Sequence, residues 1–299
     1  MNACRGNQNR YIARTAQQRP TACEDGGFSV ANGAIRPADG ALYGAETVSW
    51  DVNRRWFPLI GGPRAAILQV CDPAVAAGVA NYSAFRTNPI GRLDHTLDAM
   101  LTISFASPER RDAMLKQLRR IHAGIRGTTA DGSRYTGNDP DLQYWVLATL
   151  IDTTFEVERR YVGEMRRPDR ERFFRESKSM ASAFGVPDEL IPDDLEAFRA
   201  YMDDKFATLV PTEESREITS VLMRPGLRFV PDQSFIPLNW ITAELLPSRL
   251  RRLLDVPKLN PAELQAVRTA RMVSRTTLPR LHGVLASNPW SNRVLRPAA

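Results

Sequence analysis

Apolar residues recur at three- and four-residue spacing through most of the chain after Pro63, a period that predicts amphipathic helices. Acidic residues and prolines such as Asp139-Pro140-Asp141 supply helix-start signals. No segment shows a clear two-residue alternation, and residues 126–138 are predicted to form a loop with a turn at Asp131-Gly132. The pattern predicts an all-α fold with a helix from Pro63, a kink or restart at Pro73, and helices over 93–105, 108–125, 139–161, 169–184, 193–209, 215–223, 240–246, 248–254 and 261–277.

The first forty residues lack this periodicity. Residues 1–40 are rich in Asn, Gln, Arg, Thr and Gly, which predicts a flexible N-terminal arm. Residues 41–290 are then expected to form a single helical domain. No run reaches the roughly 18 apolar residues of a membrane span, and no apolar stretch follows the first arginines, so we expect no secretory signal and a cytoplasmic protein.

Charge and cysteine content narrow the function classes. The 40 Lys and Arg residues are scattered among 34 Asp and Glu, which gives a net charge of +6 without any block of like charges. Scattered charge is typical of a solvated surface, so no nucleic-acid partner is expected. The three cysteines are widely spaced and form no CxxC pair, so they indicate neither a zinc site nor a disulfide framework.

His122 is one of only three histidines. It lies on a predicted helical stripe with Leu115, Leu118 and Ile125, and therefore points where the apolar side chains point. Such an imidazole suits a haem ligand, which needs one lone pair and apolar surroundings. The alternative is a core histidine that hydrogen-bonds a backbone carbonyl, and spacing alone does not exclude it.

A second group comprises Arg92, His95 and Thr96, which share one helix face at i, i+3 and i+4. A cation, an imidazole and a hydroxyl together can hold a polar substrate group or orient dioxygen. The alternative is an exposed polar face opposite the leucines of the same helix.

Other catalytic classes lack their motifs. No histidine follows a glutamate by three residues, so the di-iron signature of helical bundles is missing. Neither a phosphate-binding glycine loop nor a Gly-x-Ser-x-Gly elbow occurs.

Taken in order, several segments between Leu42 and Leu254 resemble the family that contains the rubber oxygenase called latex clearing protein and the mycophenolic-acid pathway oxygenase MpaB. The segments are Gly61-Gly62-Pro63-Arg64-Ala65, Asp72-Pro73-Ala74-Val75-Ala76-Ala77-Gly78-Val79, Gly91-Arg92-Leu93-Asp94-His95-Thr96, Arg120-Ile121-His122-Ala123, Asp139-Pro140-Asp141-Leu142, Trp145-Val146-Leu147-Ala148-Thr149-Leu150, Glu196-Ala197-Phe198-Arg199-Ala200-Tyr201 and Leu245-Leu246-Pro247-Ser248-Arg249-Leu250-Arg251.

The resemblance implies a globin-like helical core that holds haem b. In the rubber oxygenases, the histidine of the matching His-Ala segment is the proximal iron ligand, which assigns His122 to that role. Their distal Arg-x-x-Lys-Thr cluster matches Arg92, His95 and Thr96, with His95 in place of the lysine. The chain departs from the family's bacterial branch, which often carries histidine where this sequence has Asp72, Tyr82 and Leu147.

The expected function is a haem-dependent oxygenase that uses dioxygen on a small apolar or natural-product substrate, such as an alkene or prenyl-like chain. Arg126, placed one helical turn after His122 by spacing, is expected to pair with a haem propionate. Two other classes stay open at this point: a non-catalytic protein that binds haem or an apolar ligand, and a basic helical scaffold without a cofactor. Oligomeric state does not follow from the sequence.

Overall fold

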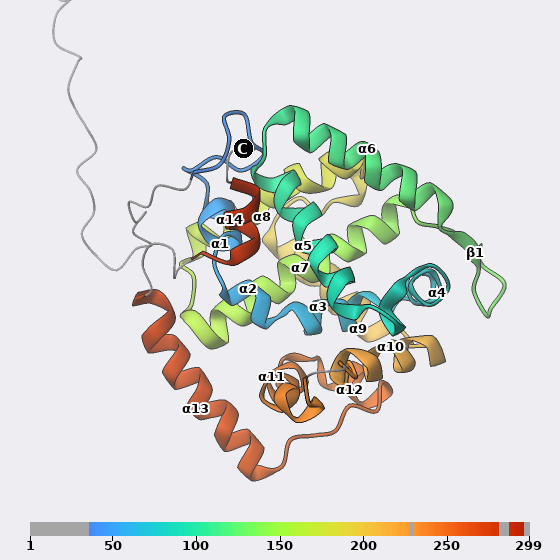
Figure 1. The fold of residues 1–299 in the computed structure, drawn as a ribbon, viewed down its shortest axis with the longest axis vertical. Helices are drawn as coiled ribbons and strands as arrows, with labels where there is room; N and C mark the ends of the chain where they lie inside the picture. The colour runs from blue at the N-terminus through green and yellow to red at the C-terminus, as the bar shows by residue number, and fades with distance from the viewer. Residues whose placement is uncertain (1–35, 228–229, 281–286, 296–299) are drawn as a thin grey trace, which may run out of the picture. The chain divides into compact units, whose positions relative to one another are not determined.

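The computed structural model describes residues 36–227, 230–280 and 287–295, and within them the fold is all-α, as predicted. Figure 1 shows the α-helices and one small hairpin. The α-helices are α1 (Val48–Asn53), α2 (Phe57–Ile60), α3 (Gly62–Gln69), α4 (Pro73–Tyr82), α5 (Pro89–Phe105), α6 (Pro108–Gly124), α7 (Pro140–Val157), α8 (Arg167–Phe184), α9 (Leu195–Thr208), α10 (Glu213–Met223), α11 (Ile236–Leu245), α12 (Ser248–Leu253), α13 (Pro261–Thr277) and α14 (Pro289–Leu295).

Shorter elements join these helices. The 3₁₀ turns are η1 (Ala84–Arg86), η3 (Asp188–Leu190), η4 (Asp232–Phe235) and η5 (Leu278–Arg280), and η2 (Glu158–Val162) is a π-helical turn that extends α7. The hairpin consists of β1 (Arg126–Thr128) and β2 (Arg134–Thr136).

Side-chain caps explain several helix starts. Asp72 accepts hydrogen bonds from the backbone N–H groups of Ala74 and Val75, so α4 restarts at Pro73. Asp139 caps α7 and Asp194 caps α9 in the same way. These carboxylates satisfy N–H groups that have no partner inside the helix, which is why the starts were readable from the sequence.

The hairpin replaces part of the predicted loop. Arg126 pairs with Thr136 and Thr128 with Arg134 in antiparallel register. Tyr135 is buried under the hairpin, close to Gly78 of α4, where an added Cβ would lie 3.7 Å from the tyrosine ring. Strands of three residues are too short to show an alternating pattern, so only the turn at Gly132, with φ 89°, was predicted.

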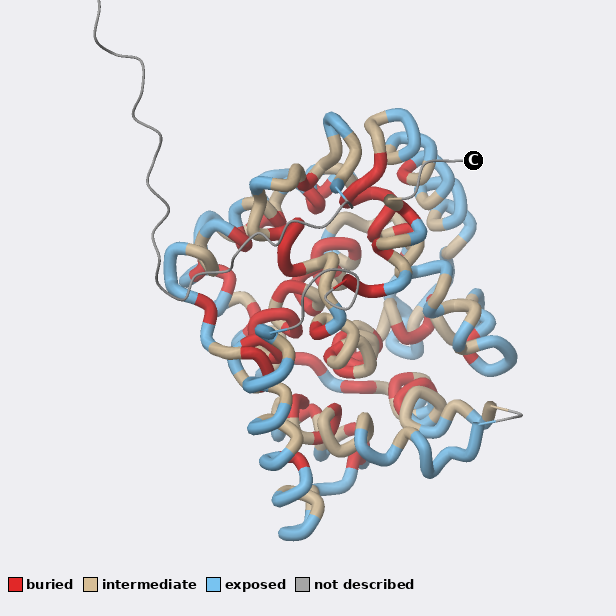
Figure 2. The backbone as a smooth tube through the Cα atoms, turned by 60° about the vertical axis from the view of Figure 1, so that its left-hand side comes forward, coloured by how far each residue is buried: buried red, intermediate tan, exposed pale blue. Residues whose placement is uncertain are grey.

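Helix α7 lies at the centre of the core. Eleven of its residues are buried, and it packs against α2, α3 and α8. Trp145 is fully buried and donates a hydrogen bond from Nε1 to the Gln69 carbonyl at 3.1 Å. Figure 2 shows buried segments of the chain in the interior and exposed ones around them. The apolar surface of α7 provides the fixed frame on which the other helices lie.

Most of the predicted N-terminal arm falls outside the described residues. At its end, Ala38 donates a backbone hydrogen bond to the Phe105 carbonyl at 3.0 Å, so residues next to the predicted boundary contact the helical domain. The division at residue 40 stays a prediction. Within the described ranges, no helix combines the length and apolarity that crossing a membrane requires.

Glu158 begins the π-helical turn and is almost fully buried. Its Oε2 accepts a hydrogen bond from the Met165 N–H at 3.1 Å, while its buried Oε1 has no partner among the described residues. Burial outweighs the nearby Arg170 and Arg55 guanidinium groups and raises the pKa of this carboxyl to about 8. The folded protein therefore favours the protonated acid.

This protonation makes stability depend on pH. The folded protein binds the Glu158 proton more tightly than the unfolded chain, whose carboxyl titrates near 4.5. Its contribution is therefore fully present below about pH 4.5 and is lost, by up to about 1.4 kcal/mol per pH unit, as the pH rises toward 8. Glu158→Gln is expected to remove this slope. Urea unfolding between pH 5 and 8.5 measures it.

The exposed Glu189 provides a matched control. Glu189→Gln is expected to leave the wild-type pH dependence intact. If Glu158→Gln and wild type show parallel stability curves across this range, the carboxyl is ionised in the folded state and the interpretation is wrong.

Candidate functional site

Arg92, His95 and Thr96 lie in the first half of α5, which Asn88 caps by accepting a hydrogen bond from the Gly91 N–H. Arg92 is half-buried, and the described residues provide no hydrogen-bond or ion-pair partner for its guanidinium. Burial lowers its pKa. Thr96 is exposed and donates to the Arg92 carbonyl at 2.9 Å, and His95 is exposed. This helix face therefore carries an unpaired cation rather than a closed polar network.

Asp94 lies between these residues in the sequence, but its carboxylate bonds to side chains of another helix. Its Oδ1 accepts from Trp290 Nε1 at 2.7 Å and from Arg293 Nη1 at 3.1 Å, both on α14. These hydrogen bonds lower the pKa of Asp94. The carboxylate nearest Arg92 in the sequence thus holds α14 against α5 and leaves Arg92 available to an anionic or polar ligand.

His122 lies in the last turn of α6 and is half-buried. Its Nδ1 is buried without a hydrogen-bond partner among the described residues, and desolvation lowers its pKa. The imidazole is therefore neutral at pH 7 and retains lone-pair character. Among the described residues, no backbone carbonyl accepts a hydrogen bond from this imidazole, which is not the arrangement of a core histidine bonded to a carbonyl.

The backbone at His122 is held closely by the segment that follows the hairpin. A Cβ at Gly137 would lie 2.8 Å from the His122 carbonyl oxygen, so only glycine fits this approach. Gly137 also donates a backbone hydrogen bond to the Ile125 carbonyl at 2.8 Å. This contact fixes where α6 ends and thereby the base of the His122 side chain.

Arg126 does not lie on the helix of His122. Helix α6 ends at Gly124, and Arg126 begins β1 with an exposed side chain. Its carbonyl accepts a hydrogen bond from the Tyr82 hydroxyl at 2.7 Å. The placement one helical turn beyond His122 is therefore wrong, because glycine at 124 and the start of strand pairing end the helix. Pairing with a propionate stays a prediction.

The two candidate groups lie on neighbouring helices. Helices α5 and α6 are consecutive and in contact, and Figure 1 shows them diverging from the short connection between them. Arg92 and Thr96 lie in the half of α5 far from this connection, and His122 lies at the far end of α6. No hydrogen bond or ion pair within the described residues joins the two groups. Ile90 and Leu93, beside Arg92, are large apolar side chains that stay 49% and 45% exposed.

Asp72, Tyr82 and Leu147, which stand where the bacterial branch often has histidine, have structural roles in this protein. Asp72 caps α4, and Leu147 is buried in the core on α7. Tyr82 is exposed and bonds the Arg126 carbonyl. Of these three side chains, none supplies an imidazole, so His122 and His95 are the histidines that the described residues offer. Within this part of the chain, no group of three or more His, Cys, Asp or Glu side chains is placed to hold a metal ion.

Sequence reasoning missed a buried arginine beside the core. Arg64, on α3, is 2% exposed and donates to Asp152 Oδ2 at 2.6 Å, to Thr153 Oγ1 at 2.6 Å and to the Leu245 carbonyl at 2.9 Å. It therefore joins α3, α7 and the end of α11. The signal was a charged residue, Asp152, within the apolar run of α7.

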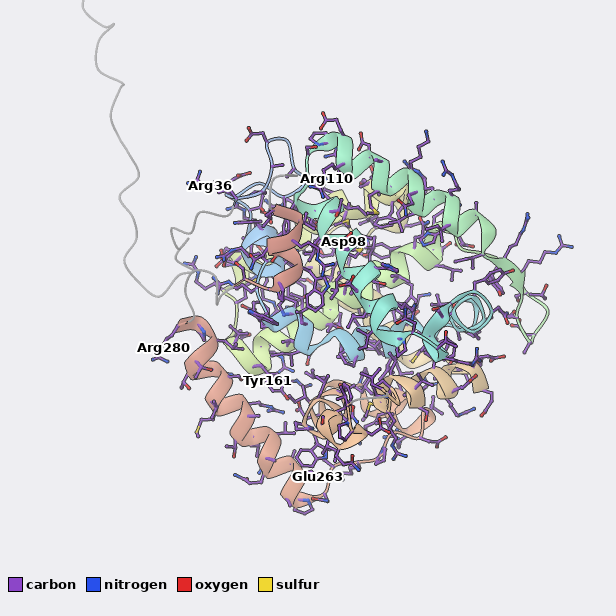
Figure 3. The ribbon with its side chains drawn as sticks, viewed as in Figure 1. Arg36, Asp98, Arg110, Tyr161, Glu263 and Arg280 are labelled. Carbon is purple, nitrogen blue, oxygen red and sulfur yellow. The ribbon has the colours of Figure 1, made fainter. Side chains whose placement is uncertain are left out.

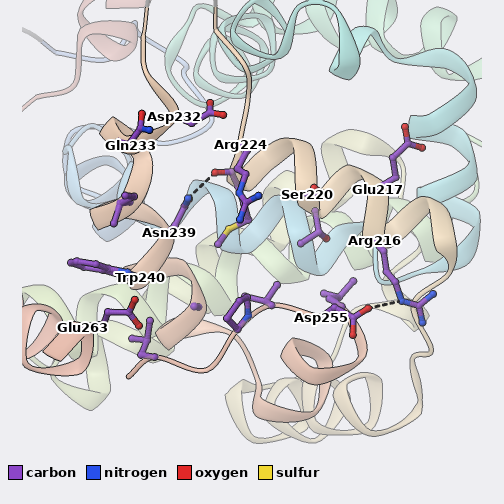
Figure 4. A pocket seen from close by; sticks show the side chains of 18 of the residues that line it. Arg216, Glu217, Ser220, Arg224, Asp232, Gln233, Asn239, Trp240, Asp255 and Glu263 are labelled. Atoms are coloured by element: carbon purple, nitrogen blue, oxygen red, sulfur yellow. Dashed lines mark hydrogen bonds and ion pairs between the residues drawn. The ribbon is translucent and has the colours of Figure 1, made fainter. Parts of the chain in front are cut away.

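A cavity of about 840 Å³ lies between α10, η4, α11 and the segment that leads to α13. Figure 4 shows Trp240 at one side of it and, at another, the ion pair between Arg216 and Asp255, whose Nε and Oδ2 atoms are 3.5 Å apart. Its apolar lining includes Met223, Trp240 and Leu259. None of the residues predicted for the site lines this cavity, which is therefore separate from the α5–α6 region.

The comparisons with known proteins identify the family. The model of the family described as "ER-bound oxygenase mpaB/B'/Rubber oxygenase, catalytic domain" matches residues 50–276, well over half of the 299 residues. No curated protein matches the chain. The matched range includes α5, α6 and the core helix α7. The chain therefore belongs to the mpaB/rubber oxygenase catalytic-domain family and has the catalytic domain of an oxidoreductase of the oxygenase class.

Proposed function

We propose that this protein is a haem-dependent oxygenase that acts with dioxygen on a small apolar substrate, such as an alkene or prenyl-like chain. The observation that carries the proposal is His122, a neutral, half-buried imidazole whose Nδ1 has no partner in the described structure. A buried polar atom without a partner costs free energy, and such costs are typical of functional sites.

The residues present fit haem b. Haem iron needs one protein ligand, so the lack of a three-residue metal cluster in the described part does not count against it. The exposed Ile90 and Leu93 supply apolar surface beside Arg92 that a flat macrocycle can cover. His122 would hold the iron, and Arg126 would pair with a propionate. Bound haem would supply the redox chemistry that activates dioxygen.

Arg92, Thr96 and His95 of α5 would interact with the polar groups that take part in the reaction. The unpaired Arg92 guanidinium can donate hydrogen bonds to oxygen that gains negative charge. Thr96 already donates to the Arg92 carbonyl, so its hydroxyl oxygen is left to accept a hydrogen bond. His95, which is exposed, would gate the open side of the site or serve as a second ligand.

The second candidate is a binding protein without turnover, and the cavity beside Trp240 favours it. A volume of about 840 Å³, lined by Met223, Trp240 and Leu259 together with charged and polar side chains, suits a small ligand that has both apolar and polar groups. Such a ligand would bind there whether or not haem is present.

Reconstitution with hemin tests the proposal. The purified chain is expected to acquire an intense Soret band at about one hemin per chain and, once reduced, to consume dioxygen when an apolar alkene is added. Haem binding without substrate-dependent uptake would support the binding protein. Protein that stays colourless with hemin would contradict a haem function of either kind.

A further inference from the structure

The segment that follows the hairpin lies against the C-terminal end of α6. Gly137 donates its backbone N–H to the Ile125 carbonyl at 2.8 Å, and Asn138 donates from Nδ2 to the Arg119 carbonyl at 3.1 Å. Arg119 and Ile125 stand three residues before and three residues after His122, about one helical turn on either side. Two hydrogen bonds from adjacent residues therefore hold the backbone on both sides of His122.

This segment is in turn tied to α7, the central helix of the core. Gln143 is buried on α7, and its Nε2 lies 3.4 Å from the Gly137 carbonyl oxygen and 3.5 Å from the Asn138 Oδ1, so one amide group donates to both residues. The next residue, Asp139, caps α7. The position of Asn138 is therefore set by α7. We call Asn138 and Gln143 the amide brace.

Apolar packing holds the end of α6 only weakly. Leu115 is the one fully buried residue of this helix, and it lies about two turns before His122. Leu118, one turn before His122, is partly buried. Figure 3 shows side chains projecting outward along α6. The exposed residues near its end are Arg119, Arg120, Ile121, Ala123 and Gly124. With so little buried surface, this end of the helix depends on hydrogen bonds from neighbouring segments for its position.

The imidazole of His122 needs such support. Its Nδ1 is buried without a hydrogen-bond partner among the described residues, and an unsatisfied buried nitrogen costs free energy. Helix ends fray, so an unsupported last turn would relieve this cost by letting the ring reach water. The bonds to the Arg119 and Ile125 carbonyls oppose that movement.

We infer that Asn138 and Gln143 are positioning residues for His122, because they hold the end of α6 where its imidazole stays partly shielded from water. Both act through the backbone of α6 and not through a contact with substrate or cofactor. Their effect on α6 does not depend on haem, whereas their effect on iron binding rests on the proposed function.

Hydrogen exchange of the protein without haem tests the effect on α6. Asn138→Ala removes the bond to the Arg119 carbonyl and is expected to speed amide exchange in residues 121–125 by about fivefold, the equivalent of one net hydrogen bond. Gln143→Leu keeps a similar side-chain volume and is expected to act in the same direction. As a control, Asn260→Ala removes an asparagine bond to the backbone at the start of α13 and is expected to leave exchange in residues 121–125 as in wild type.

A double-mutant cycle tests the effect on iron binding. Asn138→Ala is expected to weaken hemin binding by about tenfold, the lower end of the loss seen when a group that orients a metal ligand is removed. In a protein that already carries His122→Ala, the same change is expected to have no further effect, because the two residues act as one unit. A purely structural role for Asn138 would lower hemin affinity equally in both backgrounds.

The outcomes separate this inference from the proposed function. Wild-type exchange of residues 121–125 in both brace variants, or equal losses of hemin affinity in both backgrounds of the cycle, would overturn the inference. Unchanged hemin affinity in His122→Ala alone would contradict the proposed iron ligand, and faster exchange in the brace variants would then still support the positioning of His122.

Discussion

Asp152→Ala is expected to lower the free energy of unfolding by about 3–5 kcal/mol, the usual cost of removing one member of a buried ion pair. Its partner Arg64 is 2% exposed and would keep a buried positive charge without a counter-charge. Burial raises the pKa of Asp152 although Arg64 opposes this shift, so the pair is held in a strongly desolvated site. Urea unfolding at pH 7, followed by circular dichroism, measures the loss.

Two variants control this result. Asp188→Ala removes an exposed carboxylate and is expected to change stability by less than about 0.5 kcal/mol. Arg64→Met combined with Asp152→Leu removes both charges and is expected to cost less than Asp152→Ala alone, because no unpaired ion remains. A loss below about 1 kcal/mol for Asp152→Ala would show that Arg64 is adequately held by Thr153 and the Leu245 carbonyl.

The Arg64–Asp152 ion pair is a contact that local sequence spacing does not predict. The i, i+4 spacing of Asp152, Glu156 and Arg160 is typical of surface pairing along one helix, and Glu156 and Arg160 do pair in this way, with Oε2 and Nε 2.8 Å apart. Asp152 does not, because its partner is Arg64, 88 residues away. Local spacing reports only partners on the same helix, whereas a buried charge takes the partner that tertiary packing provides.

Most of the helices were predictable because they have local causes, whereas α1, α2 and α14 were not among those predicted. Apolar spacing locates their buried faces, and carboxylate caps such as Asp139 and Asp194 locate their starts. The end of α6 was placed one residue late and the hairpin was missed, since Tyr135 becomes ordered by packing near Gly78, a residue on another element.

The candidate site was predictable only in part. The apolar stripe of α6 placed His122 toward the interior, and its half-buried position agrees. The unpaired state of Arg92 was not readable, because it depends on α14 binding Asp94 through Trp290 and Arg293. The roles of Arg92, His95, Thr96, His122 and Arg126 in catalysis stay predictions.

His122→Ala is expected to weaken hemin binding by at least about a hundredfold, since even partners that only orient a ligand contribute ten- to a hundredfold. Substrate-dependent dioxygen uptake is expected to fall with it. Because burial lowers the pKa of His122 from its ordinary value of 6.5, the imidazole stays neutral at pH values down to about 6.5. The affinity of the wild-type protein for hemin is therefore expected to stay constant from pH 8 down to about 6.5. Hemin titration followed at the Soret band measures both effects.

His95→Ala separates ligation from folding in this experiment. His95 is exposed, so its removal is expected to leave stability and hemin affinity close to wild type. A shift of the Soret band in this variant would show that His95 serves as the second ligand.

Because the Nδ1 of His122 makes no hydrogen bond to the described residues, His122→Ala breaks no structural bond there, and added imidazole is expected to restore part of the lost binding. Unchanged hemin affinity in His122→Ala would show that another residue holds the iron.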